Sequence, residues 1–285
     1  DFTPSAEVLE PDPQSQVSDP NPDPAGSAAI DPGSVSGNPH EGKQPIPLNL
    51  SPDKDKPVLS TNGQKVMFIY HSHNRESWLP EMKYTGTKEL KDAFDPKINV
   101  TLLGKRLAVK LEDLGIGASN SEKDYPSVVN KYNFNFSYKY SLKTVQEAFA
   151  ANPKLEYYFD IHRDSQKREL TTVKINGVDY AQLFLIVGLK NKNWEKNKQF
   201  ADKINEKLDK KYPGISRGTY NKPSNSGNAE YNQSFSPNSI LIEVGGPENT
   251  LVESYRTIDA LAGVISEIYW DAEKVDAPVN LTKAN

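Results

Sequence analysis

One short apolar run constrains the fold more than any other stretch, because it ends in residues that are suited to binding a metal. Residues 66–70 read Val-Met-Phe-Ile-Tyr, and His71, His73 and Glu76 follow almost at once. An apolar, partly β-branched run of this length is typical of a buried strand. In an open α/β sheet, the groups just past the carboxyl end of a strand face the ligand crevice. The stretch therefore predicts a strand that delivers polar side chains to a site.

Similar apolar runs recur along the chain and alternate with segments of helical periodicity. Strands are expected at 66–70, 155–161, 181–188 and 239–244, and helices at 102–114, 142–150, 194–212 and from Asn249-Thr250 to about Asp271. A hairpin is expected around Asn176-Gly177, a pair that favours a two-residue turn. Such alternation predicts one α/β domain over residues 59–275, with a mainly parallel central sheet flanked by helices.

Three segments lack a clear period. Residues 120–137 are polar and aromatic, and residues 214–237 are rich in Gly, Asn, Ser and Tyr, which suits a loop on the substrate side. Residues 276–285, and the stretch from Asp271 that leads to them, are expected to form a loose tail.

The first 58 residues differ in composition from the rest. They are rich in Pro, Asp, Ser and Gly, and such a segment cannot bury enough apolar surface to offset its ordering entropy. We expect a disordered tether in which His40 is solvated. Since the chain opens at Asp1-Phe2 without Met, we also expect a processed or truncated form that has lost an upstream anchor.

The overall composition excludes several classes of function. A net charge of −4 argues against a nucleic-acid binder that acts through its overall field. The absence of cysteine rules out disulfides and cysteine-ligated zinc. No run approaches the roughly 18 to 20 apolar residues of a membrane span.

Three of the expected strands end in unusual polar groups, and parallel strands bring such ends to one edge of a sheet. We predict that His73, Glu76 and His162 meet around one zinc ion, since hydrolytic zinc sites take three protein ligands and leave a fourth position for water. Glu243 would move protons during hydrolysis. Three neighbours would assist: Arg163 by orienting a substrate carboxylate, Asp164 by fixing the tautomer of a ligand histidine, and His71 as a supporting or substrate-binding group.

Each residue also has a plainer interpretation. The H-x-x-E pattern of His73 and Glu76 occurs often by chance. A single histidine at a strand end is commonly a hydrogen-bonded structural residue, and Glu243 could cap the helix that follows it.

Three blocks of sequence, taken together, resemble the sporulation stage II protein P family of endospore-forming bacteria. The blocks are residues 69–77, residues 159–165 and residues 242–246 with Asn249-Thr250, and the resemblance covers about residues 62–272. That family is similar to the zinc N-acetylmuramoyl-L-alanine amidases, whose metal set is His, Glu and His with a catalytic Glu on a late strand. The resemblance implies that His73 and His162 are ligands and that Glu243 is catalytic. In the general amidases the ligand Glu comes later than Glu76, so Glu81 and Glu89 remain alternatives.

The resemblance also implies a biological setting. Family members hydrolyse peptidoglycan during forespore engulfment, by amidase activity on stem peptides and endopeptidase activity on crosslinks. They act with the stage II D protein, which cleaves glycan, and the membrane-embedded stage II M protein. They carry an N-terminal membrane anchor and work between the mother-cell and forespore membranes. Two other functions stay open, namely a zinc carboxypeptidase-like enzyme and a wall-binding scaffold with a dead site.

Overall fold

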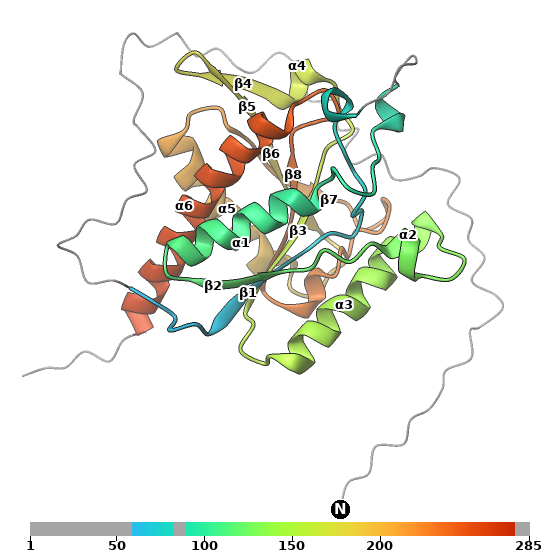
Figure 1. Ribbon diagram of the computed structural model, residues 1–285. Helices are drawn as coiled ribbons and strands as arrows, with labels where there is room; N and C mark the ends of the chain where they lie inside the picture. Colours follow the sequence, from blue (N-terminus) through green and yellow to red (C-terminus); the bar gives the residue numbers. More distant parts are fainter. Residues whose placement is uncertain (1–58, 83–88, 277–285) are drawn as a thin grey trace, which may run out of the picture.

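A six-stranded sheet forms the middle layer of the molecule, and helices cover both of its faces (Figure 1). The computed structural model describes residues 59–82 and 89–276, with side chains up to residue 273. The expected tether over residues 1–58 and all but the first residue of the expected tail at 276–285 lie outside this description.

The sheet has the strand order β2-β1-β3-β8-β6-β7. Adjacent strands are parallel except for β6 and β8, which run antiparallel. The prediction of a mixed α/β fold with a mainly parallel sheet is therefore confirmed. The strands are β1 (Lys65–Tyr70), β2 (Gly117–Asn120), β3 (Tyr157–His162), β6 (Leu183–Gly188), β7 (Ser216–Lys222) and β8 (Asn238–Val244).

The helices that surround the sheet include both long and short segments. The long helices are α1 (Thr101–Asp113), α3 (Ser137–Ala151), α5 (Trp194–Lys211) and α6 (Leu251–Asp276). Short helical segments are α2 (Tyr125–Val128), α4 (Arg168–Thr171), and the 3-10 turns η1 (Leu79–Glu81), η2 (Leu90–Asp92), η3 (Phe134–Phe136) and η4 (Gln233–Phe235).

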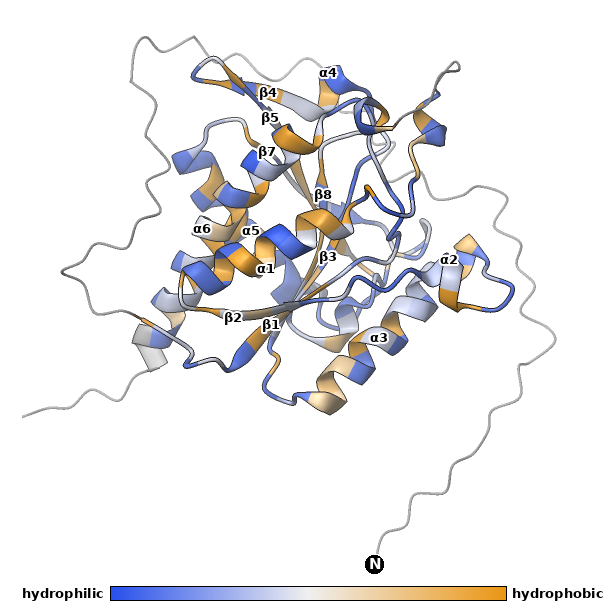
Figure 2. Ribbon diagram, viewed as in Figure 1, coloured by the Kyte–Doolittle hydropathy of each residue, from blue (hydrophilic) through white to orange (hydrophobic). Residues whose placement is uncertain are grey.

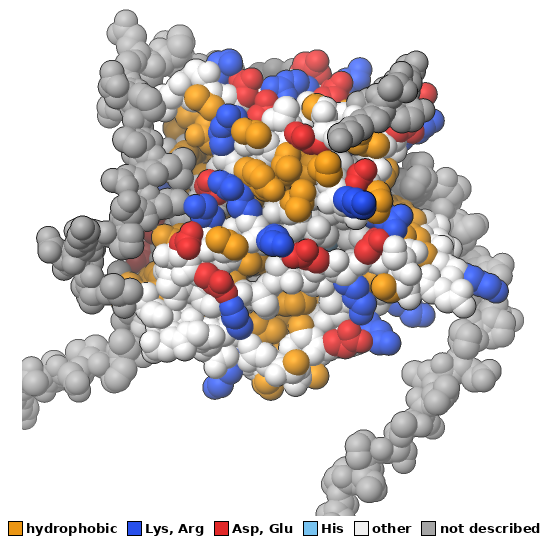
Figure 3. Space-filling model, in the orientation of Figure 1, with side chains coloured by type: hydrophobic (Ala, Val, Ile, Leu, Met, Phe, Trp, Pro, Cys, Tyr) orange, Lys and Arg blue, Asp and Glu red, His pale blue; other side chains and the backbone are white. Residues whose placement is uncertain are grey.

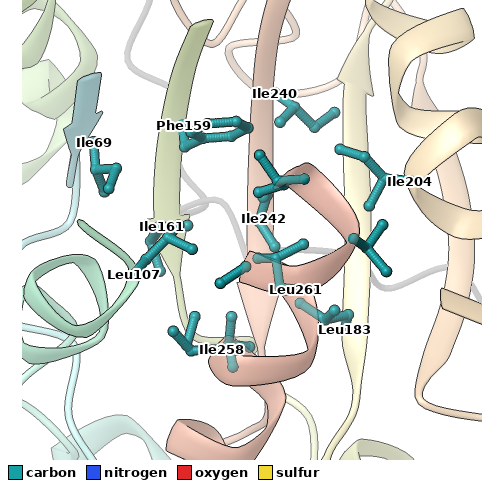
Figure 4. Packing of buried hydrophobic residues seen from close by; sticks show 14 of the residues in the cluster. Ile69, Leu107, Phe159, Ile161, Leu183, Ile204, Ile240, Ile242, Ile258 and Leu261 are labelled. Carbon is teal, nitrogen blue, oxygen red and sulfur yellow. The ribbon is translucent and has the colours of Figure 1, made fainter. Parts of the chain in front are cut away.

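Side chains of the central strands alternate between two cores. On β3, Phe159 and Ile161 join the large core beneath α1, α5 and α6, as Figure 4 shows for residues such as Leu107, Ile204 and Leu261. Tyr158 points the other way, into a smaller core with Val145 of α3. Each such fully buried side chain contributes roughly 1.5–3 kcal/mol. Because Asp160 and His162 alternate with Phe159 and Ile161, they lie on the face of α3.

Hydropathy follows the same layering. In Figure 2, α1 and α6 carry stripes of apolar residues along part of their surface, with hydrophilic residues on the remainder. The buried residues of α1 include Leu103, Leu107 and Leu111, which recur at the spacing of one helix face.

Several boundaries differ from the sequence-based expectation. The supposed loop over 214–237 contains β7, whose mostly polar residues are half-buried at the edge of the sheet and so lack an apolar signal. The polar segment over 120–137 begins at the last residue of β2 and contains two short helical turns, and α3 begins five residues before the expected start at Leu142. The stretch after Asp271 is helical to Asp276.

The hairpin around Asn176-Gly177 forms as expected, from β4 (Thr172–Ile175) and β5 (Val178–Ala181). Both turn residues have left-handed backbone, with φ of 51° at Asn176 and 81° at Gly177. A two-residue turn of this kind needs positive φ at both positions.

The start of α6 is fixed by a charged network around Glu253. Its carboxylate accepts two hydrogen bonds from Arg168, at 2.7 and 2.8 Å, and further bonds from the Asn249 side chain and the Thr250 backbone. Glu253 N–H in turn donates to Thr250 Oγ1, which completes a capping box. Partial burial opposes ionisation, but the Arg168 hydrogen bonds and the other donors outweigh it and lower the pKa of Glu253 to about 2.

We expect Glu253→Gln to destabilise the fold by about 1–2 kcal/mol at pH 7, a discounted value for a partly screened pair. Because the folded-state pKa is depressed, this stabilisation is present above pH 4.5 and is lost as pH falls towards 2. The difference in the free energy of unfolding between the two proteins, measured with urea, should therefore narrow as the pH falls from 4.5 towards 2. As a control, Glu122→Gln breaks an exposed ion pair with Lys105 and should leave stability unchanged at every pH. A stability difference between wild type and Glu253→Gln that stays constant with pH would contradict the role assigned to the Glu253 carboxylate.

Among the described helices, none combines the length and the apolar character needed to cross a membrane. On the face that carries α1, basic and acidic side chains are interspersed, and Figure 3 shows no large area of a single charge there.

Candidate metal centre

Three side chains from two separate parts of the chain converge at the carboxyl ends of β1 and β3. His73, Glu76 and His162 each offer one ligand atom, and these atoms all lie within 4.8 Å of one another. Glu76 Oε1 is 3.1 Å from His73 Nδ1, and Glu76 Oε2 is 3.6 Å from His162 Nδ1. Two imidazole nitrogens and a carboxylate oxygen form a donor set that fits zinc.

A tight turn after β1 presents the first two of these residues. Glu76 N–H donates to His73 C=O at 3.1 Å, which places both side chains on the same side of the turn. Asp124 holds the turn from outside, because it accepts two hydrogen bonds from Arg75 at 2.8 Å and one from Asn74 at 2.9 Å. The Arg75 hydrogen bonds hold the pKa of Asp124 well below its usual range, although partial burial opposes them.

The third residue, His162, is the last residue of β3 and lies between two carboxylates. Its Nδ1 faces Glu76, and its Nε2 is 2.9 Å from Asp160 Oδ1. Burial favours the neutral ring, but Asp160 and Glu76 outweigh it and raise the pKa of His162 well above its usual range. Burial likewise opposes ionisation of Glu76, yet His162 and His73 lower its pKa. Glu76 and Asp160 therefore favour positive charge at the position of His162.

Glu243 lies beside this group on the next strand. It pairs in parallel register with His162, so the two side chains project from the same face of the sheet. Glu243 is 3% exposed, and its Oε2 has no hydrogen-bond partner among the described residues. Burial raises the pKa of Glu243 well above its usual range, and Glu76 and Asp164 add to this effect while His162 and Arg163 reduce it. A buried carboxyl group of this kind is suited to accept and return a proton.

Aromatic rings form a wall beside the two histidines. The Phe134 ring stacks on His73 with 4.4 Å between centroids, and Tyr138 lies edge-on to His73 at 5.4 Å. Phe94 contacts Phe134 and is 43% exposed. The apolar wall restricts water on one side of the cluster and leaves an aromatic surface at its rim.

The structure places His71 outside the group of His73, Glu76 and His162. Because β1 ends at Tyr70, His71 and His73 do not share a face as they would in a continuing strand. His71 Nδ1 is 2.9 Å from Ile161 C=O, and Nε2 is 3.1 Å from Asn120 Oδ1. Gly104 of α1 packs directly against the ring, where a Cβ atom would overlap it.

Arg163 and Asp164 are also engaged elsewhere. The Arg163 guanidinium is buried and donates to Ala93 C=O and Asp164 C=O, while its backbone N–H donates to Glu76 Oε2 at 2.8 Å. The Asp164 carboxylate accepts from Arg217 at 2.5 Å rather than from a ligand histidine. Arg163 thus contributes to the site through its backbone.

The two alternative carboxylates do not join the cluster. Glu81 Oε1 accepts from Leu251 N–H at the start of α6, and Glu89 forms an exposed ion pair with Lys91. Of the three candidates, Glu76 is the one that lies with the histidines.

Sequence reasoning missed Asp160, which contacts His162 where Asp164 was expected to do so. A signal was present, because positions 160 and 162 are two apart in a strand and must share a face.

The sequence of this chain is similar to that of a known protein family. A family model described as Stage II sporulation protein P (SpoIIP) matches residues 11–266. Stage II sporulation protein P of Bacillus subtilis (strain 168) is 44% identical over 232 residues, which are 81% of this chain and 57% of that protein. The chain therefore spans a little more than half the length of this relative.

Two solved structures are weakly similar to this chain. Cwp6 from Clostridium difficile has a TM-score of 0.40 and 14% identity, over 73% of this chain and 29% of that one. A metallo-carboxypeptidase from Burkholderia cenocepacia has a TM-score of 0.36 and 12% identity, over 79% and 60%. Neither likeness is close enough to bear on the site. The family match and the 44% identity, by contrast, show that the chain belongs to the stage II sporulation protein P family.

Proposed function

We propose that this chain is a zinc-dependent peptidoglycan hydrolase. It would cleave the amide bond between N-acetylmuramic acid and the L-Ala of the stem peptide, and also peptide crosslinks. The observation that carries the proposal is the convergence of His73, Glu76 and His162, whose ligand atoms lie within 4.8 Å of one another. Membership of a sporulation family supports a cell-wall substrate.

The donor set defines which chemistry the centre would supply. His73, Glu76 and His162 would hold the ion, and bound zinc would lower the pKa of water to about 7 and polarise a carbonyl oxygen. His73 and Glu76 are each about 10% exposed at the side chain. The low exposure of these side chains would limit how much bulk water competes with the substrate's carbonyl group.

Glu243 would transfer the proton. Its unpartnered Oε2 would accept a proton from the attacking water as the new C–O bond forms, and would return it to the departing amine as the C–N bond breaks. Burial raises the pKa of this carboxyl group and so favours its protonated form.

The family likeness also frames where the enzyme would act. We place it outside the cytoplasm, between the mother-cell and forespore membranes, with the full-length protein anchored in a membrane. There it would thin the septal wall during engulfment, together with the stage II D and stage II M proteins. Co-purification of this chain with either protein would test the partnership directly.

Metal removal provides the first test of the activity. Protein as purified is expected to contain about one zinc per chain, and dialysis against a chelator should abolish digestion of crosslinked peptidoglycan, which zinc should restore. Mass analysis of the products should show released stem peptides and separated dimers. Release of single C-terminal residues from an intact wall would favour a carboxypeptidase. Wall binding without zinc and without products would favour a scaffold.

A further inference from the structure

Asp160, the carboxylate beside His162, is the end point of a buried chain of hydrogen bonds. Ser72 donates to it twice, from its backbone N–H to Oδ1 at 2.8 Å and from its hydroxyl to Oδ2 at 2.5 Å. The Ser72 hydroxyl is 2.7 Å from the hydroxyl of Ser141 on α3. Asn232 Nδ2 donates to Ser141 Oγ at 2.8 Å.

The donors in this chain converge on Asp160 at one end and on Tyr138 C=O at the other. Because the Ser72 hydroxyl gives its proton to Asp160, it can only accept from Ser141. The amide of Asn232 donates to Ser141 Oγ, and the Ser141 hydroxyl can donate to Ser72 Oγ at 2.7 Å or to Tyr138 C=O at 3.2 Å. Asp160 Oδ1 also lies 2.9 Å from His162 Nε2, within ion-pair distance but without the geometry of a hydrogen bond. When the His162 ring is neutral, the acceptor-only carboxylate of Asp160 favours a proton on Nε2, which leaves Nδ1 able to bind a cation beside Glu76.

The far end of the chain lies in an unusual loop between β7 and β8. Ala229, Tyr231 and Asn232 have φ of 51°, 52° and 57°, values that residues other than glycine seldom adopt. The Glu230 carboxylate accepts from Asn232 N–H at 2.7 Å and so braces the loop from within. This conformation directs the buried Asn232 amide at Ser141 and also at Tyr138 C=O, 3.1 Å away.

The same loop contacts the site by a second route. The Tyr231 ring lies 5.2 Å from Tyr138, edge to face, and Tyr138 in turn contacts both His73 and His162. The loop is therefore connected to the two histidines by a series of hydrogen bonds and by a series of aromatic contacts.

We propose that Asp160, Ser141 and Asn232 are positioning residues that fix the ring orientation of His162 for metal binding. The inference rests on the proposed zinc site and names residues beyond its ligands. Outer partners of this kind commonly alter metal affinity by about 10- to 100-fold. We therefore expect Asp160→Asn to weaken zinc binding by about 10- to 100-fold, and Ser141→Ala and Asn232→Gly by about 3- to 10-fold each.

The test is a competition titration of zinc against a chromophoric chelator, made on each folded full-length variant. The absorption spectrum of the cobalt-substituted protein serves as a second readout, since it reports ligand geometry independently of turnover. Glycine accepts the left-handed backbone at position 232, so Asn232→Gly removes the amide without straining the loop.

Ser239→Ala is the matched control. Ser239 is a buried serine on β8 whose hydroxyl has no hydrogen-bond partner among the described residues, so its removal should leave zinc affinity and the cobalt spectrum unchanged. Wild-type affinity and spectrum in both Ser141→Ala and Asn232→Gly would overturn the positioning role. Failure of the wild-type protein to bind zinc would instead overturn the proposed function.

Discussion

Replacing His162 with alanine is expected to abolish zinc binding and peptidoglycan hydrolysis together. The change removes one of three ligands, so affinity should fall by more than the roughly 100-fold seen when only an outer partner is lost. It also leaves Glu76 and Asp160 as buried carboxylates without their shared partner. Breaking such a pair costs about 3–5 kcal/mol. Zinc content, digestion of crosslinked peptidoglycan and thermal unfolding measure the three consequences.

Two other histidine variants make this result interpretable. His73→Ala removes a ligand at the more open side of the cluster and should also lose zinc, with a smaller loss of stability. His71→Ala removes a buried histidine that contacts Ile161 C=O and Asn120, outside the ligand group. It should keep zinc and activity at a temperature where it is folded. Normal zinc content in both His162→Ala and His73→Ala would refute the metal centre.

The second large effect is expected from Glu243→Gln, which should bind zinc normally yet hydrolyse peptidoglycan about 10²–10⁴-fold more slowly. The amide has nearly the shape of the carboxyl group but cannot carry a proton from water to the leaving amine. Zinc affinity and turnover, measured on the same preparation, separate this role from that of a ligand. Wild-type turnover would remove Glu243 from the mechanism.

Glu243→Gln is also expected to change the stability of the fold, and the expected change is opposite in sign to that of most substitutions in the core. Because burial raises the pKa of Glu243 in the metal-free protein, the wild-type fold loses stability as pH rises from the ordinary value of 4.5 through the folded-state pKa. Gln carries no charge at any pH. Metal-free Glu243→Gln should therefore be at least as stable as wild type at pH 7, and the advantage should vanish below pH 4.5.

Local patterns predicted the central strands and main helices because these elements carry strong apolar signals. Residues 66–70, for example, are an apolar run that forms a wholly buried central strand. The edge strands β2 and β7 were not predicted, because they are short or polar. They are strands because they pair with β1 and β6. Hydrogen bonding to a neighbour leaves no periodic signal in the residues of an edge strand.

The sequence by itself determined the α/β class, the family and which residue types stand at the ends of β1, β3 and β8. Tertiary structure alone decided which of them meet. The order β1-β3-β8 brings His73, Glu76 and His162 together, whereas the end of β1 at Tyr70 turns His71 towards α1. Likewise, Asp160 rather than Asp164 reaches His162, because alternate residues of a strand share a face while Asp164 lies beyond the strand and pairs with Arg217. Contacts of this kind depend on strand order and side-chain direction, which no stretch of sequence encodes locally.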